Sequence, residues 1–170
     1  MKKLHIFLFL LFIACSDGDL QIETLDFDSI GIQDCDDIAV NSTNVLFKID
    51  GDETLILELQ SGALTNGNST TDTVTTERSI PSQARLIYRV FSGTVTSTYF
   101  CDDFPPAEPT VTEEIEAESG TVIVKSIANA DSTAFSHTIQ FTDIRLVQSG
   151  ERITDLSIND FGEISTSITN

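Results

Sequence analysis

Tryptophan is absent from this chain of 170 residues, which also has only two tyrosines, two histidines and one methionine. Basic side chains are scarce: 9 lysines and arginines stand against 27 aspartates and glutamates, a formal net charge of −18. A field of that sign repels phosphate groups, so nucleic acids and anionic lipid surfaces are poor partners. With so few aromatic faces to stack on sugar rings, composition gives no support for carbohydrate binding.

The motifs of common enzyme chemistries are missing as well. There is no glycine-rich phosphate loop, no HExxH and no CxxC pair. His137 lies in the strand-like run AFSHTIQF, where a histidine more often packs or faces solvent than acts as a base. Glu114, Glu116 and Glu118 share one face of a predicted strand, which is typical of a solvated surface rather than of a glycosidase site. We therefore expect a protein that is not an enzyme, with an acid hydrolase as an alternative.

The one long apolar run is at the N-terminus. Lys2 and Lys3 precede residues 4–14, which are apolar apart from His5. Eleven helical residues extend about 16 Å, whereas the hydrocarbon core of a bilayer is about 30 Å thick. A basic start, an apolar segment and a small residue follow the order of a secretory signal. We therefore expect residues 1–14 to be a signal peptide that is removed.

A cysteine follows this run directly. The sequence Phe12-Ile13-Ala14-Cys15 resembles the lipobox of bacterial lipoproteins, with Phe12 where leucine is usual and Leu11 one place earlier. The resemblance implies that the Cys15 thiol is acylated, that the chain is cut before it, and that the new amino group receives a further acyl chain. Two or three chains would anchor the protein stably, because each buried methylene contributes about 0.8 kcal/mol.

The next residues are acidic. Ser16-Asp17-Gly18-Asp19 resembles the stretch that sends some lipoproteins of Bacteroidota to the outer face of the outer membrane. Without residues 1–14, 156 residues would carry 7 basic and 27 acidic side chains, a net charge of −20. We expect a lipid-anchored protein of the outer membrane, displayed on the cell surface, and a plain solvated tether is the alternative. The resemblance covers residues 1–19 and implies neither a fold nor an activity.

Alternation of apolar and polar residues recurs along the rest of the chain and predicts strands. The expected hairpins are 44–60, 86–101, 111–127 and 135–158, and the expected edge strands are 20–27 and 163–168. Their turns would lie at Asp50-Gly51-Asp52, Ser92-Gly93, Ser119-Gly120 and Ser149-Gly150. Many short strands at even spacing predict an all-β fold, an antiparallel β-sandwich of jelly-roll or immunoglobulin-like type, with a small β-barrel as the alternative. We expect an anchored acidic tether and first strand over 15–35, and a single domain over 36–170.

Two cysteines remain once Cys15 is acylated. Cys35 and Cys101 would lie in an oxidising compartment, so we expect a disulfide between them, against the alternative of two buried thiols. Such a bond holds its two Cα atoms within about 7 Å. It would gather the aspartates that flank the two cysteines: Asp34, Asp36, Asp37, Asp102 and Asp103. Carboxylates that close repel one another unless they face water or share a cation such as Ca²⁺, so the sequence predicts either five solvated aspartates or a calcium site.

Three short motifs concern covalent modification. Asp-Ser-Ile at 28–30, Asp-Thr-Val at 72–74 and Asp-Ser-Thr at 131–133 resemble the O-glycosylation motif of Bacteroidota. The resemblance implies glycans on Ser29, Thr73 and Ser132, in exposed loops.

Location and fold class leave three functions open. The first is a non-enzymatic binding or structural accessory module at the cell surface, with a protein or glycan ligand. The second is a solute- or glycan-binding partner of an outer-membrane uptake complex. The third is the acid hydrolase.

Overall fold

The computed structural model describes residues 25–66, 72–131, 133–148, 151–153 and 160–167. These residues form one short helix, α1 (Thr98–Cys101), and eight strands. The strands are β1 (Asn44–Asp50), β2 (Glu53–Leu59), β3 (Val74–Ile80), β4 (Ala84–Phe91), β5 (Val111–Ala128), β6 (Ala134–Gln148), β7 (Glu151–Ile153) and β8 (Asp160–Ser167). Every pairing between them is antiparallel, so the prediction of an all-β fold is confirmed. Within the described ranges, no helix is long and apolar enough to span a bilayer.

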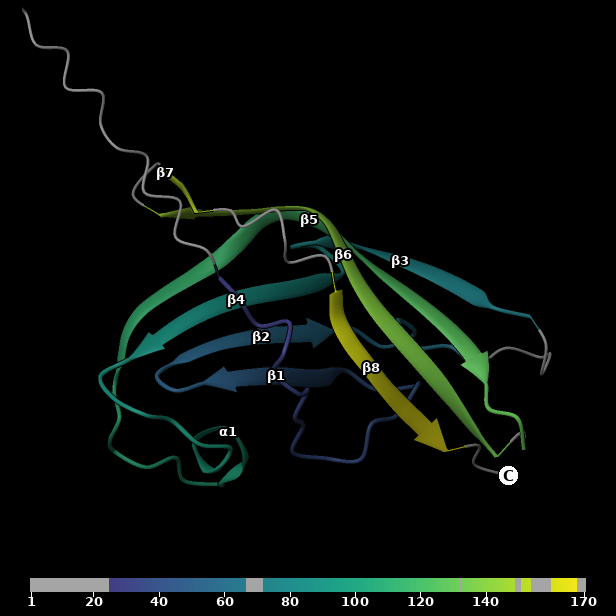
Figure 1. Cartoon of the computed structure of the whole chain (residues 1–170), viewed down its shortest axis with the longest axis horizontal. Coiled ribbons are helices and arrows are strands. Elements are labelled where there is room, and N and C mark those ends of the chain that lie inside the picture. The colour runs from purple at the N-terminus through teal and green to yellow at the C-terminus, as the bar shows by residue number, and fades with distance from the viewer. Residues whose placement is uncertain (1–24, 67–71, 132, 149–150, 154–159, 168–170) are drawn as a thin grey trace, which may run out of the picture.

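All eight strands belong to one sheet, which curls into a half-barrel (Figure 1). The main path is β1-β2-β4-β5-β6-β7, while β3 pairs with β5 and β8 pairs with β6. The long strand β5 passes from one half of the sheet to the other: its first part pairs with β4 and its last part with β3. The two halves enclose the core between them, so the layers expected of a sandwich are here two parts of one sheet.

The hairpin predicted over 44–60 is present as β1 and β2. Gly51 has φ = 64° in the turn between them, a conformation that glycine adopts without steric cost. Leu55, Leu57 and Leu59 are all buried in the main core, as their alternation indicated.

The hairpin predicted around Ser119-Gly120 is wrong, because β5 runs through this point without a turn. The register with β6 shifts here, which is the mark of a β-bulge. Buried positions of β5 are odd-numbered up to Ala117 and even-numbered from Val122, so the bulge keeps the inner face apolar on both sides of the bend. Gly120 is needed at the bend: its φ is 145°, and a Cβ there would lie 2.5 Å from Ile144 Cδ1.

Of the other expected strands, some are present in the structure and others are not. The return strand over 94–101 is wrong, since this segment contains α1 and β4 pairs with β5 instead. Strand β3 was not predicted, because it is an edge strand in which Ile80 alone is buried and the apolar alternation is weak. The strand at 163–168 is confirmed as part of β8, and the pairing of 135–148 with residues beyond the turn is confirmed by β6 and β7. Residues 25–27 are not in a strand, and residues 20–24, 149–150, 154–158 and 168 lie outside the described residues.

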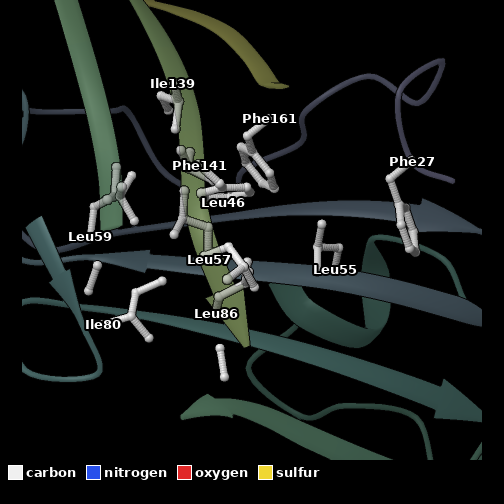
Figure 2. Packing of buried hydrophobic residues seen from close by; sticks show 14 of the residues in the cluster. Phe27, Leu46, Leu55, Leu57, Leu59, Ile80, Leu86, Ile139, Phe141 and Phe161 are labelled. Carbon is white, nitrogen blue, oxygen red and sulfur yellow. The ribbon is translucent and has the colours of Figure 1, made fainter. Parts of the chain in front are cut away.

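The core fills the space between the two halves of the sheet (Figure 2). Leu57 and Leu86 come from one half, and Ile139, Phe141 and Phe161 come from the other; each is at most 3% exposed. These side chains pack in one cluster, so the curled sheet is closed by burial of apolar surface from both sides.

Residues 25–43, which we call the N-terminal strap, cover the side of the half-barrel between β1 and β8. Phe27 is buried in the core, and Gln33 exchanges two main-chain hydrogen bonds with Phe47 of β1, at 2.8 and 2.9 Å. Ile32 lies against Gly162 of β8, where an added Cβ would meet the Ile32 Cδ1 at 3.1 Å. The strap therefore bridges β1 and β8, two of the edge strands of the sheet.

A candidate binding recess beside the disulfide

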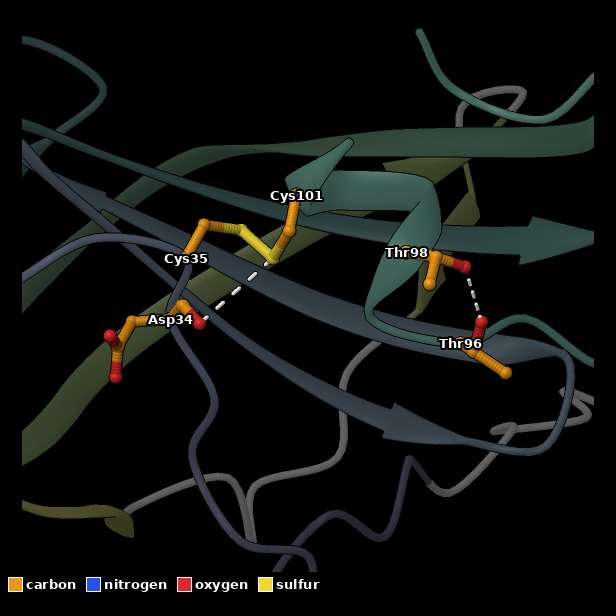
Figure 3. Close-up of a disulfide and its surroundings, with 5 residues drawn as sticks. All are labelled: Asp34, Cys35, Thr96, Thr98 and Cys101. Carbon is orange, nitrogen blue, oxygen red and sulfur yellow. Dashed lines mark hydrogen bonds between the residues drawn. A yellow bond between two sulfur atoms is a disulfide. The ribbon is translucent and has the colours of Figure 1, made fainter. Parts of the chain in front are cut away.

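A disulfide joins Cys35 of the strap to Cys101 of α1, as predicted (Figure 3). The S–S distance is 2.01 Å and the Cα–Cα distance is 5.1 Å. Both cysteines are exposed, so the bond lies at the surface of the domain. It links the strap covalently to the loop between β4 and β5.

This link holds α1 over the outer face of the sheet. There Phe47, Ile56 and Ile87 form a second buried cluster, separate from the main core. The ring of Phe100 stacks on Phe47 with centroids 4.5 Å apart, and the Tyr99 ring meets Phe91 edge-on at 4.8 Å. These contacts explain why the segment is a helical turn and not a strand: its aromatic side chains cover apolar surface that would otherwise face water.

A recess of about 470 Å³ lies between the strap and β1, beside the disulfide. The strap pairs with β1 at Gln33, and two residues farther on Cys35 is bonded to Cys101. Farther along, the Asn44 side chain closes the loop, since its Nδ2 donates to the Ala39 carbonyl oxygen (2.9 Å) and its Oδ1 accepts from the Ala39 amide (3.0 Å). The recess is the space enclosed between these two fixed points.

The walls of the recess differ in character. Phe100 contributes apolar surface, and behind it lie the fully buried residues Leu46 and Phe47. Asp34, Asp36 and Asp37 line the recess with exposed carboxylates. A space of this size with apolar walls and a few polar groups is typical of a small-molecule site. The sequence had not singled out Phe100 for this position, because nothing local shows that α1 folds back onto β1.

The five aspartates around the disulfide are all exposed, but they do not act as one group. Asp34, Asp36 and Asp37 line the recess, and Asp102 and Asp103 do not. In the part of the chain that the structure describes, no three or more His, Cys, Asp and Glu side chains are arranged to hold a metal ion. The calcium site gains no support from this arrangement and stays a prediction.

Two predicted glycosylation sites are at the surface. Ser29 is exposed in a turn of the strap, and Thr73 is exposed just before β3. Ser132, and the predicted lipid attachment site Cys15, lie outside the described residues. Both described sites are therefore accessible for modification, which stays a prediction.

His137 was expected to pack or to face solvent, and it is fully buried in the inner face of β6. Thr166 Oγ1 donates its one hydrogen to Asn66 Oδ1 (3.1 Å), so it can only accept from His137 Nε2 (2.8 Å). The other ring nitrogen of a neutral His137, Nδ1, then accepts from Ser126 Oγ (2.7 Å). Burial lowers the pKa of His137, which favours this neutral form. Ser126 and Thr166 were missed in the sequence, although each stands at an inward position of its strand.

The glutamates of β5 form a solvated outer face, as predicted. Arg85 bridges Glu116 and Glu58, with nitrogen–oxygen distances of 2.8 and 3.3 Å, and Arg89 pairs with Glu114. The hydrogen bonds from Arg85 lower the pKa of the Glu116 carboxyl. Exposed pairs of this kind contribute little stability each.

Comparison of the chain with models of protein families, with curated proteins and with solved structures found no match.

Proposed function

We propose that the protein is a lipoprotein, anchored through Cys15 in the outer membrane and displayed on the cell surface, where it acts as a non-enzymatic binding or structural accessory module. The observation that carries this proposal is the Cys35–Cys101 disulfide. Disulfides form and persist in oxidising compartments outside the cytoplasm. A domain built around one agrees with the export and anchoring that residues 1–19 imply.

The position of Cys15 also suits an anchor. It lies ten positions before Leu25, whose side chain is buried in the core. Even when fully extended, ten residues span at most about 35 Å. An anchor at Cys15 would hold the domain within that distance of the bilayer.

Replacing Cys15 by serine tests the anchor. We expect Cys15→Ser to move the protein out of the membrane fraction, because serine offers no thiol for acylation. The matched control is the double change Cys35→Ala and Cys101→Ala, which leaves Cys15 in place and should stay in the membrane fraction. A Cys15→Ser protein that remains there in wild-type amounts would show that the anchor is wrong.

Replacing Asp17 and Asp19 by alanine tests display at the surface. Protease added to whole cells should remove the domain from the wild-type protein, and the double variant should be protected. If both proteins are digested equally, these aspartates have no role in display. If neither is digested, the domain faces the periplasm.

The recess favours a second candidate, the solute- or glycan-binding partner of an uptake complex. Its volume of about 470 Å³ lies in the usual range for ligand sites, and Phe100 provides an aromatic face on its wall. A panel of oligosaccharides should then bind to the wild-type chain, and Phe100→Ala should abolish binding. Phe104→Ala is the control, since Phe104 is 90% exposed and does not line the recess.

A further inference from the structure

Lys48 is a lysine in the interior of the half-barrel. Its side chain is 2% exposed, and it lies on the same face of β1 as the core residue Leu46. Lysine is almost never buried to this extent without a partner of opposite charge, because its ammonium group loses the hydration it has in water.

Among the described residues, the Lys48 ammonium group has one hydrogen-bond acceptor. Nζ donates to the main-chain oxygen of Phe27 (2.8 Å) and lies 5.3 Å from the centroid of the Phe161 ring. An ammonium group has three hydrogens to donate. Among the described residues no carboxylate forms an ion pair with it. Burial lowers the pKa of Lys48, and the charges of Asp28 and Asp160 partly oppose this shift.

Lys48 is one of the residues that line a cavity of about 350 Å³ in the seam between the strap and β8. The cavity is lined by Lys48, by Phe161, and by the exposed carboxylate residues Asp28, Asp160 and Glu163. Because the carboxylates are exposed and the lysine is buried, the positive charge lies at the inner end of the cavity and the negative charges lie toward solvent. The cavity thus has two ends of opposite charge.

We propose that this cavity binds a small zwitterion, an α-amino acid or a molecule with the same pair of charges. The ligand carboxylate accepts hydrogen bonds from the Lys48 donors that no described residue uses, and its ammonium group lies toward Asp28 and Asp160. A simple anion is attracted by the lysine but repelled by the surrounding carboxylates. A simple cation is attracted by the carboxylates but repelled by the lysine. A molecule that carries both charges in the matching order is stabilised at both ends.

Isothermal titration calorimetry on the purified full chain tests this assignment. Glycine and L-leucine serve as zwitterions, and acetate and methylammonium serve as the two halves. We expect at least one zwitterion to bind saturably, about tenfold or more tighter than either half, a difference of about 1.4 kcal/mol. Lys48→Met should abolish binding. The matched control is Lys125→Met, which removes an exposed lysine that donates to Gln140 and should leave binding unchanged.

A second variant separates ligand recognition from folding, since Lys48→Met also breaks the bond to Phe27. Asp28→Asn with Asp160→Asn keeps the lysine and changes two exposed side chains. In this variant the zwitterion should bind about tenfold more weakly, and acetate should bind more tightly than to the wild-type chain. The proposal is overturned if neither zwitterion gives saturable heat, which would mean that water alone fills the cavity. It is equally overturned if binding persists in Lys48→Met, or if the preference for zwitterions is unchanged in the asparagine variant.

Discussion

Replacing Cys35 and Cys101 together by alanine should lower the free energy of unfolding by about 4 kcal/mol. The disulfide closes a loop of 66 residues, measured from one cysteine to the other. This loop contains β1 to β4 and α1, so the bond restricts about half of the unfolded domain. The chain-entropy relation for a loop of this length gives about 4 kcal/mol at 25 °C.

The packing of α1 makes a second contribution that can be measured apart from the first. Phe100 is half-buried and stacks on Phe47, so Phe100→Ala with the disulfide intact should cost about 1–2 kcal/mol. If α1 detaches once the bond is lost, the alanine pair should cost about 5–6 kcal/mol, and Phe100→Ala should then add nothing further. If α1 stays in place, the two changes should act additively.

Urea denaturation followed by circular dichroism measures both contributions to the free energy of unfolding, that of the disulfide and that of the packing of α1. The wild-type chain, the alanine pair, Phe100→Ala and their combination form one cycle, and Phe104→Ala is the control because its side chain is 90% exposed. Mass spectrometry without reduction should first show the peptide that joins Cys35 to Cys101. If the alanine pair lowers the free energy of unfolding by less than about 1 kcal/mol, the loop-closure argument is refuted. So small a change would mean that the disulfide does not restrict the unfolded chain to the extent that a loop of this length requires.

Two further predictions concern the sheet. The stability contributed by neutral His137 should be fully present above pH about 6.5 and should be lost as the pH falls from there toward the lowered pKa of the folded state. The reason is that the unfolded chain takes up the proton at a higher pH than the folded chain does. In thermal melts at pH 5–7, His137→Gln should remove this dependence of stability on pH. Gly120→Ala should destabilise the domain by about 3 kcal/mol or more in urea denaturation, because its Cβ would clash with Ile144 at 2.5 Å and its φ is positive, whereas Gly93→Ala, with nothing within 4 Å, should change stability little. Equal effects at the two glycines would show that the bend does not depend on Gly120.

Local sequence predicted those elements that local contacts determine. The hairpin of β1 and β2 follows from alternating leucines on either side of Asp50-Gly51-Asp52, all within 17 residues. Ser119-Gly120 has the same kind of signal but forms a bulge. A turn and a bulge both use a glycine with positive φ, and the choice between them is made by β6, which pairs with β5 on both sides of the bend.

The two candidate sites were harder to predict, because they depend on which face of β1 is inside. Val45, Phe47 and Ile49 are more apolar than the alternate residues Leu46 and Lys48, yet Leu46 and Lys48 face the main core. Phe47 is buried because α1 covers the outer face, and Val45 is 49% exposed. A helical turn about 50 residues away in the sequence thus changes the meaning of the alternation, and no window of sequence around β1 contains that information.

The strap connects the proposed anchor with both cavities. It forms one wall of the recess beside the disulfide and one wall of the Lys48 cavity. In each of the two spaces, β1 contributes residues to the wall that faces the strap. The strap pairs with β1 through the two main-chain hydrogen bonds between Gln33 and Phe47. It is also held by packing of its side chains, by single hydrogen bonds such as that from Lys48 to Phe27, and by the disulfide. A ligand in either cavity touches the strap and the sheet at once, so it stabilises the closed seam by RT ln(1 + [L]/Kd). Binding in either cavity should therefore be measurable as resistance of the strap to opening, at the segment closest to the proposed anchor.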